Sequence, residues 1–193
     1  MRQRLAVDHP PVYNSVRSNL DWADHAVRTL VTGGLIAWLA PDFVWDPACG
    51  DASILEAAYR LRPFRQAFLA DISAPQIEAL NPSFPHEKVV EDVVHAEFFV
   101  AAAFKNNCLV LTEVLEHLED PGATLRQARE AFGALVASVP IGDPEHGGNH
   151  EHLWAWDEAA FEAELRETGW EPAVTVTVQL PGVGGNSQIW VAR

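Results

Sequence analysis

The chain has 193 residues, 48% of them hydrophobic, which is enough to bury a core and too apolar for a disordered chain. Its formal net charge is -14. Because nucleic acids and anionic membranes are also negatively charged, neither is expected as a partner. The two cysteines, Cys49 and Cys108, suit a reducing compartment, and no leader or apolar run of membrane-spanning length is apparent. We therefore expect a cytoplasmic protein.

Residues 1–40 predict an arm and a helical cap that packs onto the main domain, residues 41–193, so that the chain forms a single compact domain overall. Residues 1–13 are expected to be irregular. Apolar residues that recur at steps of three and four predict an amphipathic helix over 14–31. Gly33-Gly34 is expected to end this helix, and residues 35–39 to form a short turn or a second helix.

Short, continuously apolar runs separated by helical segments make up most of the chain. The predicted strands are 43–45, 67–70, 89–90, 108–111 and 134–139, and the predicted helices are 53–61, 74–80 and 123–132. This order favours a parallel sheet covered on both faces. Near the C-terminus apolar and polar residues alternate, which predicts an antiparallel hairpin of 174–180 with 188–191. The expected fold class for residues 41–193 is α/β, a doubly wound and mostly parallel sheet of about seven strands closed by that hairpin.

The stretch from Phe43 to Ser53 reads as a strand, a tight turn and the start of a helix. Gly50 would let the backbone of this turn approach a ligand closely, because it has no Cβ. Acids end four of the predicted strands, at Asp46, Asp71, Asp92 and Glu113. A single acid in such a position is more often a helix cap, but four in sequence suit a ligand with vicinal hydroxyls and an amine, such as an adenosine.

Three later segments resemble the class I S-adenosylmethionine-dependent methyltransferases. Leu111-Thr112-Glu113-Val114-Leu115-Glu116-His117-Leu118-Glu119-Asp120-Pro121 is similar to the family's segment after the fourth strand, and Ser138-Val139-Pro140 to the end of its fifth strand. The third segment, His152 with Trp156-Asp157-Glu158 and Phe161 to Gly169-Trp170, is similar to the family's last helix before the final hairpin. The resemblance spans roughly residue 42 to the C-terminus. It implies a Rossmann-like fold and a methyltransferase that uses S-adenosylmethionine and releases S-adenosylhomocysteine.

Carried over by position, the resemblance assigns the cofactor to the strand ends. It places Asp46 and the turn against the methionine part, Asp71 at the ribose hydroxyls, Asp92 at the adenine amine and the backbone of 112–114 near the sulfonium. The expected cofactor-binding residues are Asp46, Pro47, Ala48, Cys49, Gly50, Asp71, Ile72, Asp92, Val93, Thr112, Glu113 and Val114. The family's turn usually holds more glycine, so Ala48 and Ala52 would be strained if either adopts a positive φ.

Two other ligand classes fit these residues less well. A nicotinamide cofactor is disfavoured because the Gly-x-Gly-x-x-Gly turn is absent. Asn81-Pro82-Ser83-Phe84 is similar to the amine clamp of nucleic-acid adenine methyltransferases, but it precedes the third predicted strand. The position of that clamp, after the fourth strand, is occupied here by Thr112-Glu113-Val114-Leu115. Asn81-Pro82-Ser83-Phe84 is therefore interpreted as the end of a helix.

The acceptor is expected between the N-terminal arm and helix and the loop of residues 141–152. Candidates to line its pocket are Tyr13, Arg17, Trp22 and Trp154. His150 and His152 titrate near neutrality and are the candidates to take a proton from the acceptor. The loop's three histidines and three acids could also bind a metal ion. A polar loop over the site is the favoured interpretation, and no metal is predicted.

The leading hypothesis is a methyltransferase that acts on a small-molecule acceptor. Two alternatives stay open, namely methylation of a protein or nucleic-acid partner, and a protein that binds S-adenosylmethionine without turnover. The residues indicate neither the acceptor, nor the atom that is methylated, nor the oligomeric state.

Overall fold

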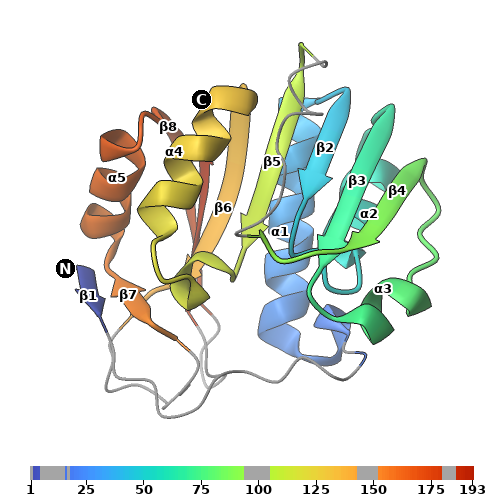
Figure 1. Cartoon of the computed structure of the whole chain (residues 1–193), viewed down its shortest axis with the longest axis horizontal. Helices are drawn as coiled ribbons and strands as arrows, with labels where there is room; N and C mark the ends of the chain where they lie inside the picture. The colour runs from blue at the N-terminus through green and yellow to red at the C-terminus, as the bar shows by residue number, and fades with distance from the viewer. Residues whose placement is uncertain (1, 5–15, 17, 94–104, 143–151, 180–185) are drawn as a thin grey trace.

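A computed structural model of the whole chain describes residues 2–4, 16, 18–93, 105–142, 152–179 and 186–193. Its main feature is a seven-stranded sheet in the order β4-β3-β2-β5-β6-β9-β8 (Figure 1). In chain order the strands are β2 (Phe43–Asp46), β3 (Gln66–Asp71), β4 (His86–Val90), β5 (Asn107–Thr112), β6 (Ala134–Pro140), β8 (Pro172–Val178) and β9 (Ser187–Ala192). The strands β2 to β6 pair in parallel, and β9 pairs antiparallel with both β6 and β8. The predicted fold class is confirmed.

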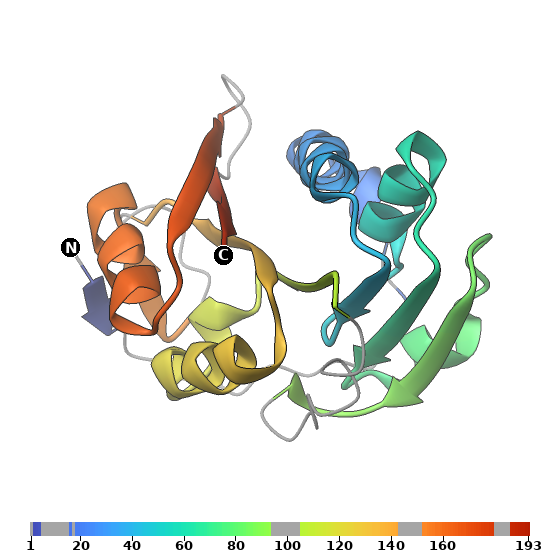
Figure 2. The same cartoon turned by 90° about the horizontal axis from the view of Figure 1, so that it is seen from above.

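Helices cover both faces of this sheet. Viewed from above, α1 (Ala23–Leu39) and α2 (Ser53–Leu61) lie on one side, and α4 (Pro121–Ala131) and α5 (Glu158–Glu167) on the other (Figure 2). Ile77 of α3 (Ala74–Ala79) packs in the same cluster as α1 and α2. Along β5, Cys108 and Val110 face that cluster whereas Leu109 and Leu111 face the other. Because both faces of β5 are buried, its sequence is apolar without interruption from Cys108 to Leu111.

The first long helix differs from the prediction. α1 runs through Gly33-Gly34 instead of ending there, and residues 19–21 form a 3-10 turn, η1 (Asn19–Asp21), capped by Ser18. A Cβ on Gly33 would lie 2.8 Å from the Cβ of Ala57 in α2. The glycine therefore lets the two helices pack closely, and α1 ends only at Ala40, whose φ is 53°.

A second, two-stranded sheet was not predicted. β1 (Arg2–Arg4) pairs antiparallel with β7 (Trp154–Trp156), so part of the arm expected to be irregular is a strand. The rest of that arm, residue 1 and residues 5–13, lies outside the described residues. Figure 1 shows β1 and β7 beside α5, near the lower edge of the main sheet in that view.

The carboxyl ends of the parallel strands share one edge of the sheet, at the bottom of Figure 1. The start of α1, the 3-10 turn η4 (Leu115–His117) and β7 lie toward this edge. This arrangement brings together segments that are far apart in the sequence. Among the residues described, no helix is both long enough and apolar enough to cross a membrane.

Candidate functional site

The turn after β2 has an unusual backbone. Gly50 has a φ of 51° and Ala52, which precedes α2, a φ of 57°, so both adopt the left-handed conformation. This conformation costs an alanine about 1–2 kcal/mol. The strain expected for an alanine in this turn is therefore confirmed at Ala52, whereas Ala48 is not among the residues with positive φ.

Asp71, at the end of β3, holds this turn in place. The Gly50 N–H donates to Asp71 Oδ2 at 3.0 Å, and the Ser73 N–H donates to Asp71 Oδ1 at 2.8 Å. The Cys49 N–H also donates to the carbonyl of Ala70 at 2.9 Å. Hydrogen bonds thus join the ends of β2 and β3 through this turn.

Asp46, at the end of β2, is buried with 1% of its surface exposed. Burial raises the pKa of its carboxyl to about 8, and the negative charges of Asp71 and Asp51 add to this effect. The Ala48 N–H donates to Asp46 Oδ1 at 3.4 Å and partly offsets it. The carboxyl is therefore mostly protonated near pH 7, and a cation placed beside it would favour its ionised form. These residues fit a ligand that carries an ammonium group and hydroxyls.

Other predicted cofactor residues line the same edge. Cys49 and Val93 are buried, and burial raises the pKa of the Cys49 thiol, so this thiol is protonated at neutral pH. Ile72 follows β3 with 52% of its surface exposed, and Asp92 follows β4 half-buried. An exposed isoleucine beside strand-end acids offers an apolar surface to a flat ring.

Glu113, at the end of β5, makes contacts that the sequence did not indicate. Its Oε2 lies 3.0 Å from Arg28 Nη1, and its Oε1 accepts a hydrogen bond from Ser138 Oγ at 2.8 Å. Its φ is 54°, and its N–H donates to the Ser138 carbonyl. The side chain of Glu113 is therefore held by α1 and β6. Arg28 is a buried cation on a mostly apolar helix, which is the one sequence signal that could have marked it.

Glu116, in η4, is a second site residue that sequence reasoning missed. It is fully buried, and neither carboxyl oxygen has a hydrogen-bond partner in the part of the chain that the structure describes. Burial raises the pKa of Glu116 well above its usual range; Glu113 raises it further and Arg28 opposes the shift. Its Oε1 lies 3.9 Å from Nε2 of His117.

The acceptor candidates are only partly described. His152 is half-buried, with its ring 4.8 Å from the His117 ring, centroid to centroid. Trp22 has 66% of its surface exposed, just before α1. Trp154 is half-buried, and its indole N–H donates to the Leu118 carbonyl at 2.8 Å. The other candidates, His150, Tyr13 and Arg17, lie outside the described residues.

The N-terminal segment touches the turn directly. Ser18 Oγ donates to Asp51 Oδ2 at 3.0 Å, while Asp51 Oδ1 accepts from the Ser53 N–H at 3.1 Å. The chain that leads into α1 therefore lies over the start of α2.

Comparison with known proteins shows which class of fold the chain has. The sequence matches no model of a protein family and no curated protein sequence. Magnesium protoporphyrin IX methyltransferase (ChlM) from Synechocystis PCC 6803, solved with S-adenosylhomocysteine, is similar in structure with a TM-score of 0.65 and 17% identity, over 93% of this chain and 90% of that one. The N-methyltransferase NodS from Bradyrhizobium japonicum WM9, also with S-adenosylhomocysteine, has a TM-score of 0.67 and 16% identity, over 93% and 92%.

A third similar structure has a different activity. The [4+2]-cyclase SpnF has a TM-score of 0.69 and 13% identity, over 97% of this chain and 87% of that one. The chain thus has the fold of the class I S-adenosylmethionine-dependent methyltransferases. Because a cyclase shares this fold, the reaction has to be argued from the site.

Proposed function

We propose that this protein is an S-adenosylmethionine-dependent methyltransferase that acts on a small-molecule acceptor. The observation that carries the proposal is the acidic turn after β2, where buried Asp46 lies within the electrostatic reach of Asp51 and Asp71. The turn is built around Gly50, whose N–H is held by Asp71. A site of this kind suits a ligand with a cationic amino-acid part and a ribose.

Each strand end would bind one part of the cofactor. Asp46 would pair with the ammonium group, Asp71 would accept hydrogen bonds from the ribose hydroxyls through its remaining lone pairs, and Asp92 would accept from the adenine amine. The backbone of 112–114 would lie near the sulfonium. When bound, the cofactor supplies a methyl group that is already activated. The protein's own task is to align the acceptor and exclude water.

A small molecule is the acceptor class that fits best. The net charge of -14 opposes binding to nucleic acid, and ChlM and NodS are both methyltransferases of this fold. ChlM acts on magnesium protoporphyrin IX, which is a small molecule. We propose that the acceptor binds beside Trp22, Trp154 and His152, at the edge of the sheet where the cofactor would lie. Tyr13, Arg17 and His150 lie outside the described residues, and their part in the pocket stays a prediction. His150 or His152 would take the acceptor's proton where the reaction needs a base.

The first test is cofactor binding by calorimetry. We expect S-adenosylhomocysteine to bind, and Asp71→Ala to bind more weakly by about 1–3 kcal/mol, because charge-assisted hydrogen bonds are lost. Asp42→Ala is the matched control, since Asp42 is an exposed acid at the opposite end of β2. Equal affinity of Asp71→Ala and the unchanged protein, or no binding to the unchanged protein, would refute the site.

The second test is turnover. Labelled S-adenosylmethionine is incubated with the protein and fractionated small metabolites, and release of S-adenosylhomocysteine is measured. His152→Ala is expected to reduce turnover and leave cofactor affinity unchanged. Binding of the cofactor without any turnover across the fractions would favour a binding protein instead of an enzyme.

A further inference from the structure

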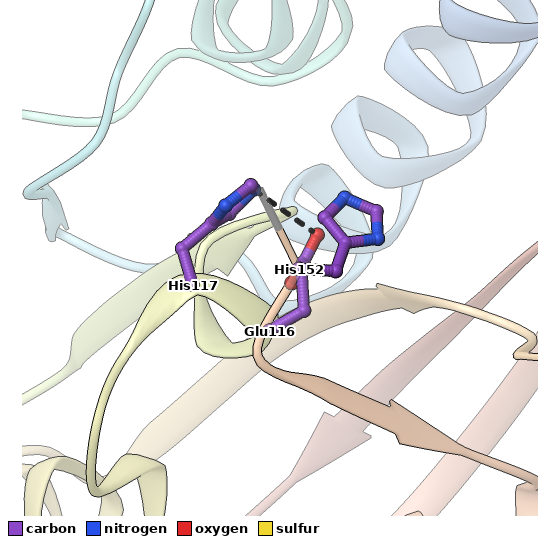
Figure 3. A group of neighbouring side chains, drawn as sticks. All are labelled: Glu116, His117 and His152. Atoms are coloured by element: carbon purple, nitrogen blue, oxygen red, sulfur yellow. Dashed lines mark ion pairs between the residues drawn. The ribbon is translucent and has the colours of Figure 1, made fainter. Parts of the chain in front are cut away.

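Three side chains outside the cofactor turn converge on one point at the same edge of the sheet. Glu116 and His117 come from η4, and His152 comes from the segment that leads into β7 (Figure 3). One ligand atom from each, two imidazole nitrogens and a carboxylate oxygen, lies within 4.8 Å of the other two. Figure 3 shows the three side chains pointing toward one another.

The backbone fixes this convergence. The N–H of Leu153 donates to the carbonyl of Glu116 at 2.7 Å, which ties the residue after His152 to η4. The rings of His117 and His152 lie edge to face, at 81° to each other. Glu116 and His117 are adjacent in η4, so the three donor side chains come from two segments that this bond joins.

Glu116 is the observation that points to a ligand. Its carboxyl is fully buried, and in the described part of the chain neither of its oxygens accepts or donates a hydrogen bond. A buried carboxyl without partners is costly, and such groups are normally paired or bound to a metal. The ring nitrogen His117 Nε2 lies 3.9 Å from Oε1, too far for a hydrogen bond.

We propose that Glu116, His117 and His152 bind a divalent transition-metal ion, with Zn²⁺ the ion that this donor set suits best. Zinc binds imidazole nitrogen and carboxylate oxygen at about 2.0–2.2 Å, so two donors on one ion lie about 3–4 Å apart. The 3.9 Å between Glu116 Oε1 and His117 Nε2 lies within this range. All three ligand atoms lie within 4.8 Å of one another, so a small side-chain rotation would bring them to coordination distance. Two histidines and one carboxylate make a set of three protein ligands, which leaves a coordination position open.

The open position would serve the acceptor. The cluster directly follows Glu113 and Val114, which the proposed function places near the sulfonium. A metal there would polarise an acceptor oxygen and replace a histidine base. This role rests on the proposed function, whereas binding of the metal does not.

The experiment measures metal binding without cofactor or acceptor. Protein stripped with a chelator is titrated with ZnCl₂ by calorimetry, and with Co²⁺ by visible absorption, which reports the coordination number. We expect one Zn²⁺ per chain at micromolar affinity or better, and binding about 100-fold weaker in Glu116→Gln and in His152→Ala. His86→Ala is the matched control, because His86 starts β4 at the opposite edge of the sheet.

Each outcome decides the proposal. Absence of stoichiometric Zn²⁺ binding, or wild-type affinity in His152→Ala, would overturn it. Binding that persists in these variants but disappears when His146 and His150 are replaced would place the metal elsewhere and overturn it as well. If Glu116→Gln fails to fold, the partly exposed His117 and His152 carry the test through His117→Ala and His152→Ala. Affinity for S-adenosylhomocysteine should be unchanged in all these variants, so a failed metal site and a failed cofactor site are distinguishable.

Discussion

Arg28 and Glu113 form an ion pair across two elements that are 85 positions apart in the chain, with 3.0 Å between Nη1 and Oε2. Both side chains are largely shielded from water, with 10% and 21% of their surface exposed. The pair joins α1 to the end of β5. It therefore couples the position of the first long helix to the edge where the site lies.

Replacing Arg28 should destabilise the protein. Arg28→Met keeps much of the apolar stem but leaves Glu113 without its cation, and we expect a loss of about 2 kcal/mol in the free energy of unfolding. Urea denaturation measures this loss. Glu113→Gln and the double variant complete a thermodynamic cycle. A coupling energy of zero between the two positions would contradict a stabilising role for the pair.

Gly33 and Gly34 are adjacent in α1 and should respond oppositely to alanine. A Cβ on Gly33 would meet Ala57 Cβ at 2.8 Å and backbone atoms of α2 at 3.0 Å, whereas a Cβ on Gly34 meets nothing within 4 Å. Gly34→Ala should stabilise the protein by about 1 kcal/mol through helix propensity. Gly33→Ala should destabilise it by about 1–3 kcal/mol through overpacking. Thermal unfolding of the two variants measures both changes in stability. Changes of the same sign would disprove this packing.

Asp46 should make the stability of the ligand-free protein depend on pH. The carboxyl ionises near 3.8 in the unfolded chain and near 8 in the fold, so between these values the folded state binds the extra proton. The Asp46 contribution therefore falls as the pH rises from about 4 to about 8 and levels off above that range. Asp46→Asn removes this contribution. The difference in unfolding free energy between the two proteins, measured across this range, should shift in favour of the variant as the pH rises.

Binding of S-adenosylmethionine should release a proton. Near pH 7 the Asp46 carboxyl is mostly protonated, because its pKa is about 8. An ammonium group placed beside it favours the ionised form, so up to about one proton should leave per bound ligand. Calorimetry in buffers of different ionisation enthalpy counts this proton. Asp46→Asn is the control, and an unchanged proton count in that variant would show that another group titrates.

The strands could be predicted because burial on both faces leaves a local signal. Val110 and its neighbours in β5 are apolar without interruption, and the following acid marks the strand end. β1 and β7 have only three residues each and carry no such period. The extent of α1 was wrong because Gly33-Gly34 usually ends a helix, and only the packing of α2 shows why this helix continues.

Some residues of the candidate site could likewise be predicted from the sequence, and others could not. The positions of Asp46 and Asp71 could be predicted, since each ends a largely apolar strand and the topology brings these ends together. Arg28, Ser138 and Glu116 could not, because their roles depend on contacts between distant elements. Nothing local distinguishes Glu116 from an ordinary acid of a polar segment. Its lack of partners appears only once the fold has buried it.

The place of β9 in the sheet bears on how the protein is made. β9 is the last strand along the chain, yet it lies between β6 and β8 and pairs with both. Until Ser187–Ala192 has left the ribosome, β6 has an open edge and β8 has no neighbour in the main sheet. The main sheet cannot be completed before Ser187–Ala192 is available, and until then the nascent chain exposes an apolar strand edge, when aggregation and chaperone binding compete with the native sheet.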